Sequence, residues 1–285
     1  MPQHSHNRAN FKKTLIALAV GAALTPHSAW ALDFAQSPPG TVEPYVAPNV
    51  IISVDDSGSM NFCLNKESAS NCIDDTGAND NTTPNADGTW PLNSRRINVL
   101  KYSLKKVFND TTLLPDGKIR LAWQVLHNNG GSSGAESVDS DSMNTNSMRP
   151  VAGSHRTNFI SFVNNLDPGS GTPTHRMFKQ ADDYMRRGLS SNSPWASKPG
   201  EANPTYLGCR RNYHIVMTDG RWNGYNNAYA AGGNIDGETS KTLGDGSTIY
   251  SNTGANAGQT NLYRDSTDNT LADWAFKSWS ERLQD

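Results

Sequence analysis

Residues 50–60 read VIISVDDSGSM, a short apolar run that ends in two acids, two hydroxyls and a glycine. The run is rich in β-branched residues and too short for a helix, so it predicts a buried strand. In doubly wound α/β proteins, ligands bind just beyond the carboxyl ends of strands. Asp55, Ser57 and Ser59 follow there at alternate positions. Three hard oxygen donors on one turn favour a divalent cation such as Mg²⁺.

The hydrophobic periodicity beyond this stretch alternates between strand and helix. Strands are expected at 119–126 and 213–217, and helices at 95–109, near 156–166 and from about 268. Another helix is expected after the loop at 170–174, with an apolar face that runs from Met177 to Met185. Ser94 and Asp268 are the expected N-caps of the first and last of these helices. Such alternation is typical of an α/β fold with a doubly wound, mostly parallel sheet flanked by helices.

The domain boundaries follow from composition. Residues 32–49 are rich in proline and predict an extended lead-in, so residues 50–285 form the expected α/β domain. Four polar segments, 61–93, 127–153, 189–208 and 221–267, predict long loops. The chain stops at Asp285 within the last predicted helix, where a parallel sheet normally receives another strand. We therefore expect the domain to be incomplete at its C-terminus.

The N-terminus has the pattern of a secretory signal peptide. Arg8, Lys12 and Lys13 precede an apolar stretch at 14–24, and Ala29-Trp30-Ala31 is a small-x-small cleavage site. The apolar stretch is too short to span a bilayer. Residues 1–31 are therefore predicted to be removed on export, which leaves no transmembrane anchor.

Export also bears on charge and on the cysteines. The 25 basic and 27 acidic residues give a net charge of −2, and loss of three basic residues with the signal peptide makes it −5. This balance argues against nucleic-acid binding. In an oxidising compartment, Cys63 and Cys72 bracket a polar loop and are a possible disulfide. Cys209 would then be odd, and its pairing with either of the other two remains open.

Two distant residues complete the candidate cation site. Thr172 lies in a Gly-Thr-Pro loop before a helix, and Asp219 lies in a Thr-Asp-Gly segment that ends a strand. The carboxyl ends of parallel strands meet at one edge of the sheet, so Asp219 should lie near Asp55. The alternative is that residues 56–59 form a turn with local hydrogen bonds. A lone histidine at position 175 is expected to be solvated.

These five positions resemble the metal-ion-dependent adhesion site of von Willebrand factor A domains, whose pattern is D-x-S-x-S, a distant Thr and a distant Asp. The resemblance implies that the serine hydroxyls coordinate Mg²⁺, or Mn²⁺ or Ca²⁺, and that Thr172 does so directly or through water. Asp55 and Asp219 would supply negative charge, partly through water. A carboxylate from a partner would complete the coordination.

Further motifs resemble the N-terminal region of the PilC/PilY group of type IV pilus tip-associated adhesins and assembly factors. They are the Pro-Pro lead-in, Ala-Pro-Asn-Val at 47–50, Asp-Asp-Ser-Gly-Ser-Met at 55–60, Cys-Arg-Arg-Asn-Tyr at 209–213 and Leu-Ala-Asp at 271–273. Members of that group carry an A domain followed by a C-terminal β-propeller, and residues 50–285 are expected to correspond to the A domain alone. The resemblance implies minor pilins or a host surface receptor as partners, and a route through the periplasm to the pilus tip.

The expected function is therefore a secreted, metal-dependent binding module and not an enzyme. The alternative is a structural or mechanical element of the pilus tip, in which the metal serves folding. A weaker alternative is a secreted metal-dependent hydrolase. Asp-Ser-Gly at 56–58 and Asp-Thr-Gly at 75–77 resemble aspartic-protease signatures, but they lie only 19 residues apart and the second follows no apolar strand.

Overall fold

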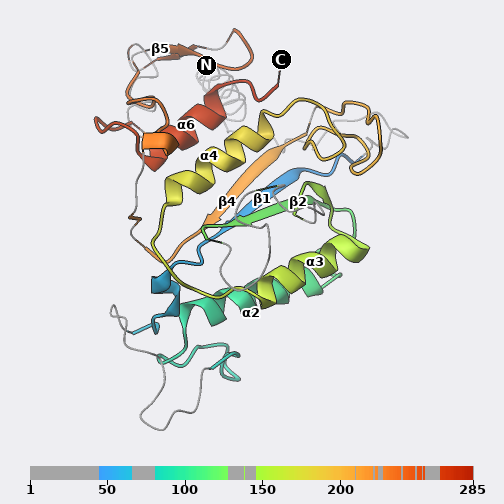
Figure 1. Cartoon of the computed structure of the whole chain (residues 1–285), viewed down its shortest axis with the longest axis vertical. Helices are drawn as coiled ribbons and strands as arrows, with labels where there is room; N and C mark the ends of the chain where they lie inside the picture. The colour runs from blue at the N-terminus through green and yellow to red at the C-terminus, as the bar shows by residue number, and fades with distance from the viewer. Residues whose placement is uncertain are drawn as a thin grey trace, which may run out of the picture. The chain divides into compact units, whose positions relative to one another are not determined.

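A four-stranded sheet in the order β3-β2-β1-β4 forms the centre of the computed structural model (Figure 1). Its strands are β1 (Asn49–Val54), β2 (Arg120–Val125), β3 (Arg149–Pro150) and β4 (Asn212–Met217). β1 pairs in parallel with β2 and β4, and β3 pairs antiparallel with β2. The register aligns Val54 with Val125 and with Met217. The segments that follow these three strands therefore begin at one edge of the sheet.

The structure describes only part of the chain. The described residues are 45–65, 81–127, 138, 146–208, 210–220, 222–223, 227–238, 240–247, 249–251, 253 and 264–284. The predicted signal peptide, most of the lead-in, Cys72 and Cys209 lie outside these residues. Residues 46–285 form one structural unit.

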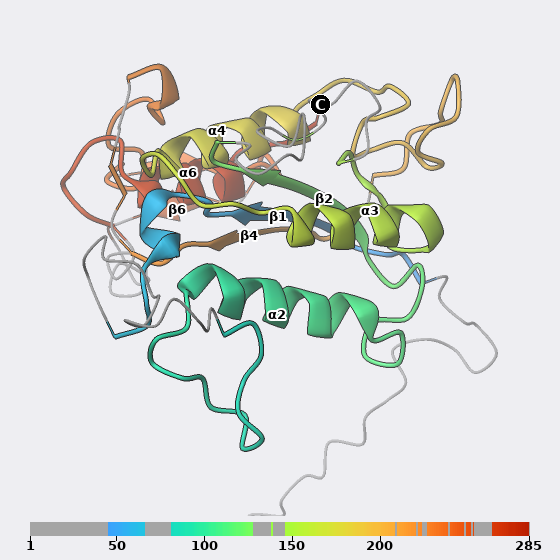
Figure 2. The same ribbon diagram turned by 60° about the horizontal axis from the view of Figure 1, so that its bottom comes forward.

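Helices cover both faces of the sheet (Figure 2). They are α2 (Arg96–Asn109), α3 (Gly153–Asn164), α4 (Thr174–Met185) and α6 (Leu271–Ser280), with short 3₁₀ helices η1 (Gly58–Asn61) and η2 (Asn227–Tyr229). α2 and α3 lie on one face, α4 lies on the other, and α6 packs against α4. The predicted doubly wound α/β fold is confirmed. None of the helices in the described ranges is long and apolar enough to cross a membrane.

Alternate side chains of β1 pack on the two faces of the sheet. Successive side chains of a strand point to opposite faces. Val50, Ile52 and Val54 pack in the cluster that contains the aromatic side chains of α2 and α3. Ile51 packs in the cluster of α4. Every residue of β1 is buried, as is typical of a parallel strand covered on both faces.

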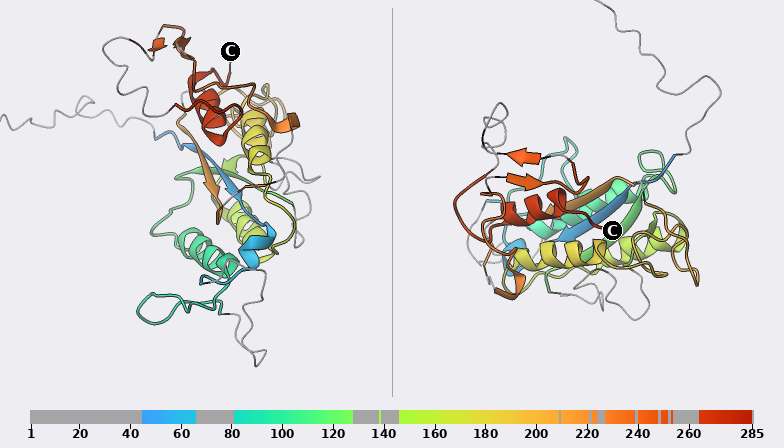
Figure 3. Two further views of the ribbon diagram at one scale, coloured as in Figure 1. Left: turned by 90° about the vertical axis from the view of Figure 1, so that its left-hand side faces the viewer. Right: turned by 90° about the horizontal axis from the view of Figure 1, so that it is seen from above.

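Several elements differ from the sequence-based expectation, among them β3, which lies in the segment 127–153 that was expected to be a loop. The N-cap of α2 is Arg95 rather than Ser94, and that of α6 is Thr270 rather than Asp268. A small antiparallel hairpin, β5 (Ser240–Thr242) and β6 (Ile249–Ser251), lies in the segment expected to be a loop (Figure 3). Tyr250 packs its ring against Phe276 of α6, with centroids 4.8 Å apart. Through that ring contact, the polar hairpin packs against α6.

Asp273 is the residue that anchors α6. It is fully buried, and its Oδ2 accepts hydrogen bonds from the N–H (2.7 Å) and hydroxyl (3.0 Å) of Thr270. Its Oδ1 accepts from the N–H groups of Ile235 (2.6 Å) and Asp236 (3.1 Å). One carboxylate therefore caps the helix and also binds the loop before the hairpin.

We predict that Asp273→Ala lowers the free energy of unfolding by about 2–4 kcal/mol, because it removes a cap and leaves buried N–H groups unpaired. Asp268→Ala is the matched control, since Asp268 is exposed and does not cap the helix. Urea denaturation measures both. Equal effects of the two substitutions would contradict this role for Asp273.

His155 makes stability depend on pH. Burial lowers the pKa of His155 to about 4, and the neutral ring donates from Nε2 to the carbonyl of Leu121 at 2.8 Å. The unfolded chain has an ordinary histidine pKa of about 6.5 and so binds more protons between pH 4 and 6.5. Stability should therefore fall as the pH falls through that window.

We predict that this one residue accounts for a loss of roughly 3 kcal/mol between pH 7 and pH 4. His155→Gln retains an N–H donor but cannot titrate, so its unfolding free energy should vary less with pH. Chemical denaturation at several pH values measures the difference. Parallel pH profiles for the wild type and His155→Gln would show the idea to be wrong.

Candidate metal centre

The segment after β1 turns sharply into η1 at the carboxyl edge of the sheet (Figure 1). Asp55, Asp56 and Ser57 are completely buried there. The N–H of Asp55 donates to the carbonyl of Met217 at 2.9 Å, which continues the β1–β4 ladder by one residue. Parallel pairing therefore holds the start of the predicted site against the end of β4.

Asp55 links the ends of the two strands through its side chain. Its Oδ1 accepts from the N–H of Ser57 at 2.8 Å, and its Oδ2 accepts from the hydroxyl of Thr218 at 2.7 Å. The first bond closes a local turn, as the alternative reading of the motif expects. The second joins residues 163 positions apart, so the motif is more than a local turn.

Three of the predicted residues form a continuous hydrogen-bonded chain. The hydroxyl oxygens of Ser57 and Ser59 lie 3.1 Å apart. The Ser59 hydroxyl donates to Oδ1 of Asp219 at 2.9 Å. Asp55 joins this chain through the backbone of Ser57. The structure thus brings together four of the five positions that the sequence singles out.

The loop that carries Thr172 is attached to the same turn by backbone hydrogen bonds. The N–H of Gly169 donates to the carbonyl of Asp56 (2.8 Å), and the N–H of Gly58 donates to the carbonyl of Ser170 (3.0 Å). A Cβ on Gly58 would lie 3.3 Å from that Ser170 oxygen, so a larger residue would push the loop away. Thr172 is 3% exposed and lies two residues along.

Asn223 holds Thr172, a role that the sequence motifs do not reveal. Its Oδ1 accepts from the N–H of Thr172 at 2.8 Å, and its own N–H donates to the Thr172 carbonyl at 3.0 Å. A Cβ on Gly171 would lie 2.7 Å from that Oδ1. Glycine at 171 is therefore what lets Asn223 reach Thr172.

Arg96, the first residue of α2, contacts the site and was not predicted. Its Nη1 lies 2.7 Å from Oδ2 of Asp219. The Arg96 and Asp219 side chains are 21% and 10% exposed, so this ion pair is largely shielded from water. Helix periodicity places position 96 on α2, but only the folded arrangement places it beside Asp219.

Neighbouring polar residues hold the edge of the sheet. Oδ1 of Asp56 accepts from the N–H of His127 at 3.0 Å, and the His127 ring hydrogen-bonds to the carbonyl of Gly171. Asp56 therefore supports the end of β2.

His175 was expected to be solvated, and this prediction is wrong. His175 is fully buried, with its ring edge-on to that of Trp222 and the ring centroids 4.5 Å apart. Burial lowers the pKa of His175.

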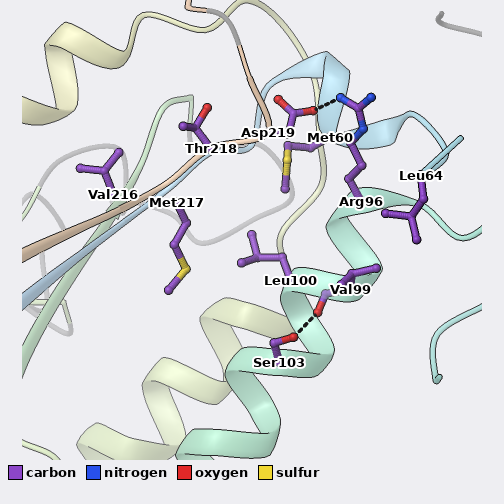
Figure 4. Close-up of a pocket in the computed structure, with 10 residues that line it drawn as sticks. All are labelled: Met60, Leu64, Arg96, Val99, Leu100, Ser103, Val216, Met217, Thr218 and Asp219. Atoms are coloured by element: carbon purple, nitrogen blue, oxygen red, sulfur yellow. Dashed lines mark hydrogen bonds and ion pairs between the residues drawn. The ribbon is translucent and has the colours of Figure 1, made fainter. Parts of the chain in front are cut away.

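A cavity of about 420 Å³ adjoins the site between α2 and β4 (Figure 4). Leu100 of α2, Met217 of β4 and Met60 of η1 supply apolar walls. Arg96 and Asp219 also line it, joined by their ion pair. One face of the cavity is therefore apolar and another is charged.

The donor set is made of oxygen atoms alone. It combines the carboxylates of Asp55 and Asp219 with the hydroxyls of Ser57, Ser59 and Thr172. Hard oxygen donors suit Mg²⁺, Mn²⁺ or Ca²⁺ and disfavour soft metals. The described part of the chain contains no group of three or more His, Cys, Asp or Glu residues that could hold a metal ion. Any cation at this edge would therefore depend on the hydroxyls.

Cys63 follows η1 closely and is buried and disulfide-bonded. Its backbone also forms an isolated antiparallel bridge with Arg95, directly before α2. The proposed partner, Cys72, and the alternative, Cys209, both lie outside the described residues. The pairing of Cys63 with Cys72 stays a prediction.

Comparison with protein-family models gives no match, and no solved structure matches the chain significantly. Curated proteins do match. The chain is 37% identical over 161 residues to type IV pilus biogenesis factor PilY1 of Pseudomonas aeruginosa strain PAK. It is 34% identical over 161 residues to PilY1 of strain PAO1, and 33% identical over 171 residues to PilY1 of strain UCBPP-PA14.

The matched segment is a large part of this chain but a small part of the relatives. It covers 56–60% of this chain and 12–13% of the length of each relative. Identity above 30% over at least 161 residues is too extensive to reflect fold similarity alone. Over this segment, the chain is similar to the PilY1 type IV pilus biogenesis factors.

Proposed function

We propose that the chain is an exported binding module of a type IV pilus tip protein. It captures a carboxylate of its partner through a divalent cation held at Asp55, Ser57, Ser59, Thr172 and Asp219. The partner is a pilus component, such as a minor pilin, or a host surface receptor. The route is export, then the periplasm, then the cell surface. The proposal assigns no catalytic residue.

The hydrogen-bonded chain Ser57–Ser59–Asp219 is the observation that carries this proposal. It brings two hydroxyls and a carboxylate from opposite ends of the sequence to one edge of the sheet. The relatives, named type IV pilus biogenesis factors, support the link to the pilus. The partner and the chemistry of binding are proposed from the residues of the site.

The residues of this chain have separable tasks in the proposal. Ser57 and Ser59 present neutral oxygen ligands, while Asp55 and Asp219 balance the charge of the cation. Asn223 and the hydrogen bond from Gly58 to Ser170 keep the Thr172 loop in place. A divalent cation bound there supplies a coordination position for an incoming carboxylate.

In the alternative, the module is a structural element and the cation serves folding. The hydrogen bonds and the ion pair at the site argue against a cation that serves only folding. Asp55 is held by Thr218 and by the backbone of Ser57, and Asp219 is held by Ser59 and Arg96. Both carboxylates already accept hydrogen bonds, and the charge of Asp219 is offset by Arg96, so these local contacts form without a cation.

We predict that Mg²⁺ raises the melting temperature of the chain in proportion to the logarithm of its concentration. A cation that binds only the folded state adds about 2.7 kcal/mol at a hundredfold excess over its Kd. Ser57→Ala should abolish most of that gain. Ser103→Ala is the control, because Ser103 is exposed and its hydroxyl bonds only within α2, to Val99.

Binding to purified pilus fibres, with and without EDTA, completes this test. The proposal expects EDTA and Ser57→Ala to abolish binding, and Ser103→Ala to leave it intact. If Mg²⁺ stabilises the wild type while Ser57→Ala still binds fibres, the structural alternative is correct. If Mg²⁺ has no effect on stability, the site assignment is wrong.

We also predict that Arg96 weakens cation binding, because its guanidinium competes for Oδ2 of Asp219. Arg96→Gln should bind Mg²⁺ about tenfold more tightly, a gain of about 1.4 kcal/mol in a site partly screened by solvent. Without Mg²⁺, the same variant should be slightly less stable, since Asp219 loses its partner.

Isothermal titration with Mg²⁺ measures the first effect and urea denaturation the second. Arg96→Lys keeps the positive charge and is the matched control, so its Mg²⁺ affinity should stay near that of the wild type. Unchanged affinity in Arg96→Gln would contradict the competition.

A further inference from the structure

Arg120 is a buried arginine whose guanidinium has no hydrogen-bond partner among the residues that the structure describes. It is the first residue of β2 and is only 2% exposed. Its Nε, Nη1 and Nη2 are all buried and make no hydrogen bond. A guanidinium carries five N–H donors and keeps its charge in proteins. Leaving such a group buried and unpaired is strongly unfavourable, so the site calls for an acceptor.

Strand geometry places Arg120 at the amino edge of the sheet, on the face of α4. Side chains two residues apart in a strand share a face. Gln124 of β2 donates to the carbonyl of Met177, near the start of α4, and Ala122 packs with Tyr184, near its end. Arg120 therefore lies toward the C-terminal end of α4. That edge is opposite the candidate metal centre (Figure 1).

Two more arginines lie close enough to act on it. Burial above all, together with the charges of Arg210 and Arg149, lowers the pKa of Arg120 to about 10. Burial also lowers the pKa of Arg210, whose Nε is buried and unpaired. Three guanidinium groups thus share one region of the protein.

The known partners of these arginines are neutral. Nη1 of Arg210 donates to the carbonyl of Ala47 at 2.6 Å, and Nη2 of Arg149 donates to Oδ1 of Asn192 at 2.9 Å. Every ion pair found within the described residues involves other cations. Within the described residues, no carboxylate therefore balances the charges of these three arginines.

The loop that contains Gly200 passes close to Arg149. Gly200 has φ +89°, and a Cβ there would lie 2.8 Å from Nη1 of Arg149. Glycine suits this position because residues with a Cβ rarely adopt a φ of +89°. One neutral acceptor remains, the buried and unpaired Oδ1 of Asn49, which is the register partner of Arg120. It can serve one or two of the five N–H groups and leaves the charge unbalanced.

We propose that Arg120, Arg149 and Arg210 form an anion-binding site that takes a small free oxyanion of the phosphate or sulfate type. Guanidinium groups match the spacing of oxyanion oxygens through paired N–H donors. A small free ion fits better than a macromolecular group, because the nitrogens of Arg120 have no exposed surface. Arg149 and Arg210 are only partly buried, so entry is past these two side chains. The inference does not rest on the proposed metal centre.

Thermal unfolding in sodium phosphate and sodium sulfate, against sodium chloride and sodium acetate at equal ionic strength, tests the proposal. Phosphate or sulfate should raise the melting temperature by about 5 °C or more at a hundredfold excess over Kd. Arg120→Met should remove that rise. In chloride alone, Arg120→Met should melt at or above the wild-type temperature, because it removes an unpaired buried charge.

Arg156→Met is the matched control. Arg156 is fully engaged: it pairs with Asp116 at 2.8 Å and donates to the carbonyls of Phe108 and Leu114. This variant should melt lower in every salt and keep the phosphate response. Arg210→Gln, at a partly exposed position, should fold and show a weaker response, which covers the case in which Arg120→Met fails to fold.

Three results would overturn the proposal. The first is the same melting temperature in all four salts, and the second is an equal rise with acetate. The third is an Arg120→Met variant that melts lower than the wild type in chloride and still responds to phosphate. That third result would mean that Arg120 has protein partners of its own.

Discussion

The parallel pairing of β1 with β4 is the constraint on which the rest of the structure depends. It aligns Val54 with Met217, so residues 55 and 218 leave the sheet side by side. The hydrogen bond from the Thr218 hydroxyl to Asp55 is possible only because of that alignment. The next residue, Asp219, then comes within reach of Ser59. A shift of one residue would turn every β1 side chain to the other face and separate these groups.

The charged residues at the carboxyl ends and at the amino ends of the parallel strands differ in how far the described residues balance their charge. At the carboxyl edge, Asp219 is shared between Ser59 and Arg96, so its negative charge is already balanced by the protein. At the amino edge, Arg120 has no such balance. A cation entering the first edge must compete with an existing ion pair, whereas an anion entering the second would relieve a desolvated charge. The two edges therefore differ in what a ligand has to displace.

The parts of the fold that sequence predicts well are those set by local pattern. The β-branched run of β1 and the periodicity of Leu104 and Phe108 in α2 each report burial that the structure confirms. The N-cap of α6 was misplaced because Asp268 and Thr270 are both good caps by type. Only the reciprocal bonds with Asp273 select Thr270. The role of Arg96 at the site was missed for the same reason, since it depends on where α2 lies relative to β4.

β4 lies at the end of the described sheet, next to the cavity that adjoins the candidate site. Among the described strands, β4 has only β1 as a neighbour, and its Tyr213 and Ile215 are 49% and 43% exposed. The cavity between α2 and β4 adjoins this strand and is lined by Arg96 and Asp219. Any group that fills the cavity therefore contacts the Arg96–Asp219 ion pair, which is also the pair that a cation at the proposed site would have to disrupt. If the proposed cation binds there, occupancy of the cavity and cation affinity would be thermodynamically linked, each changing the other by the same factor.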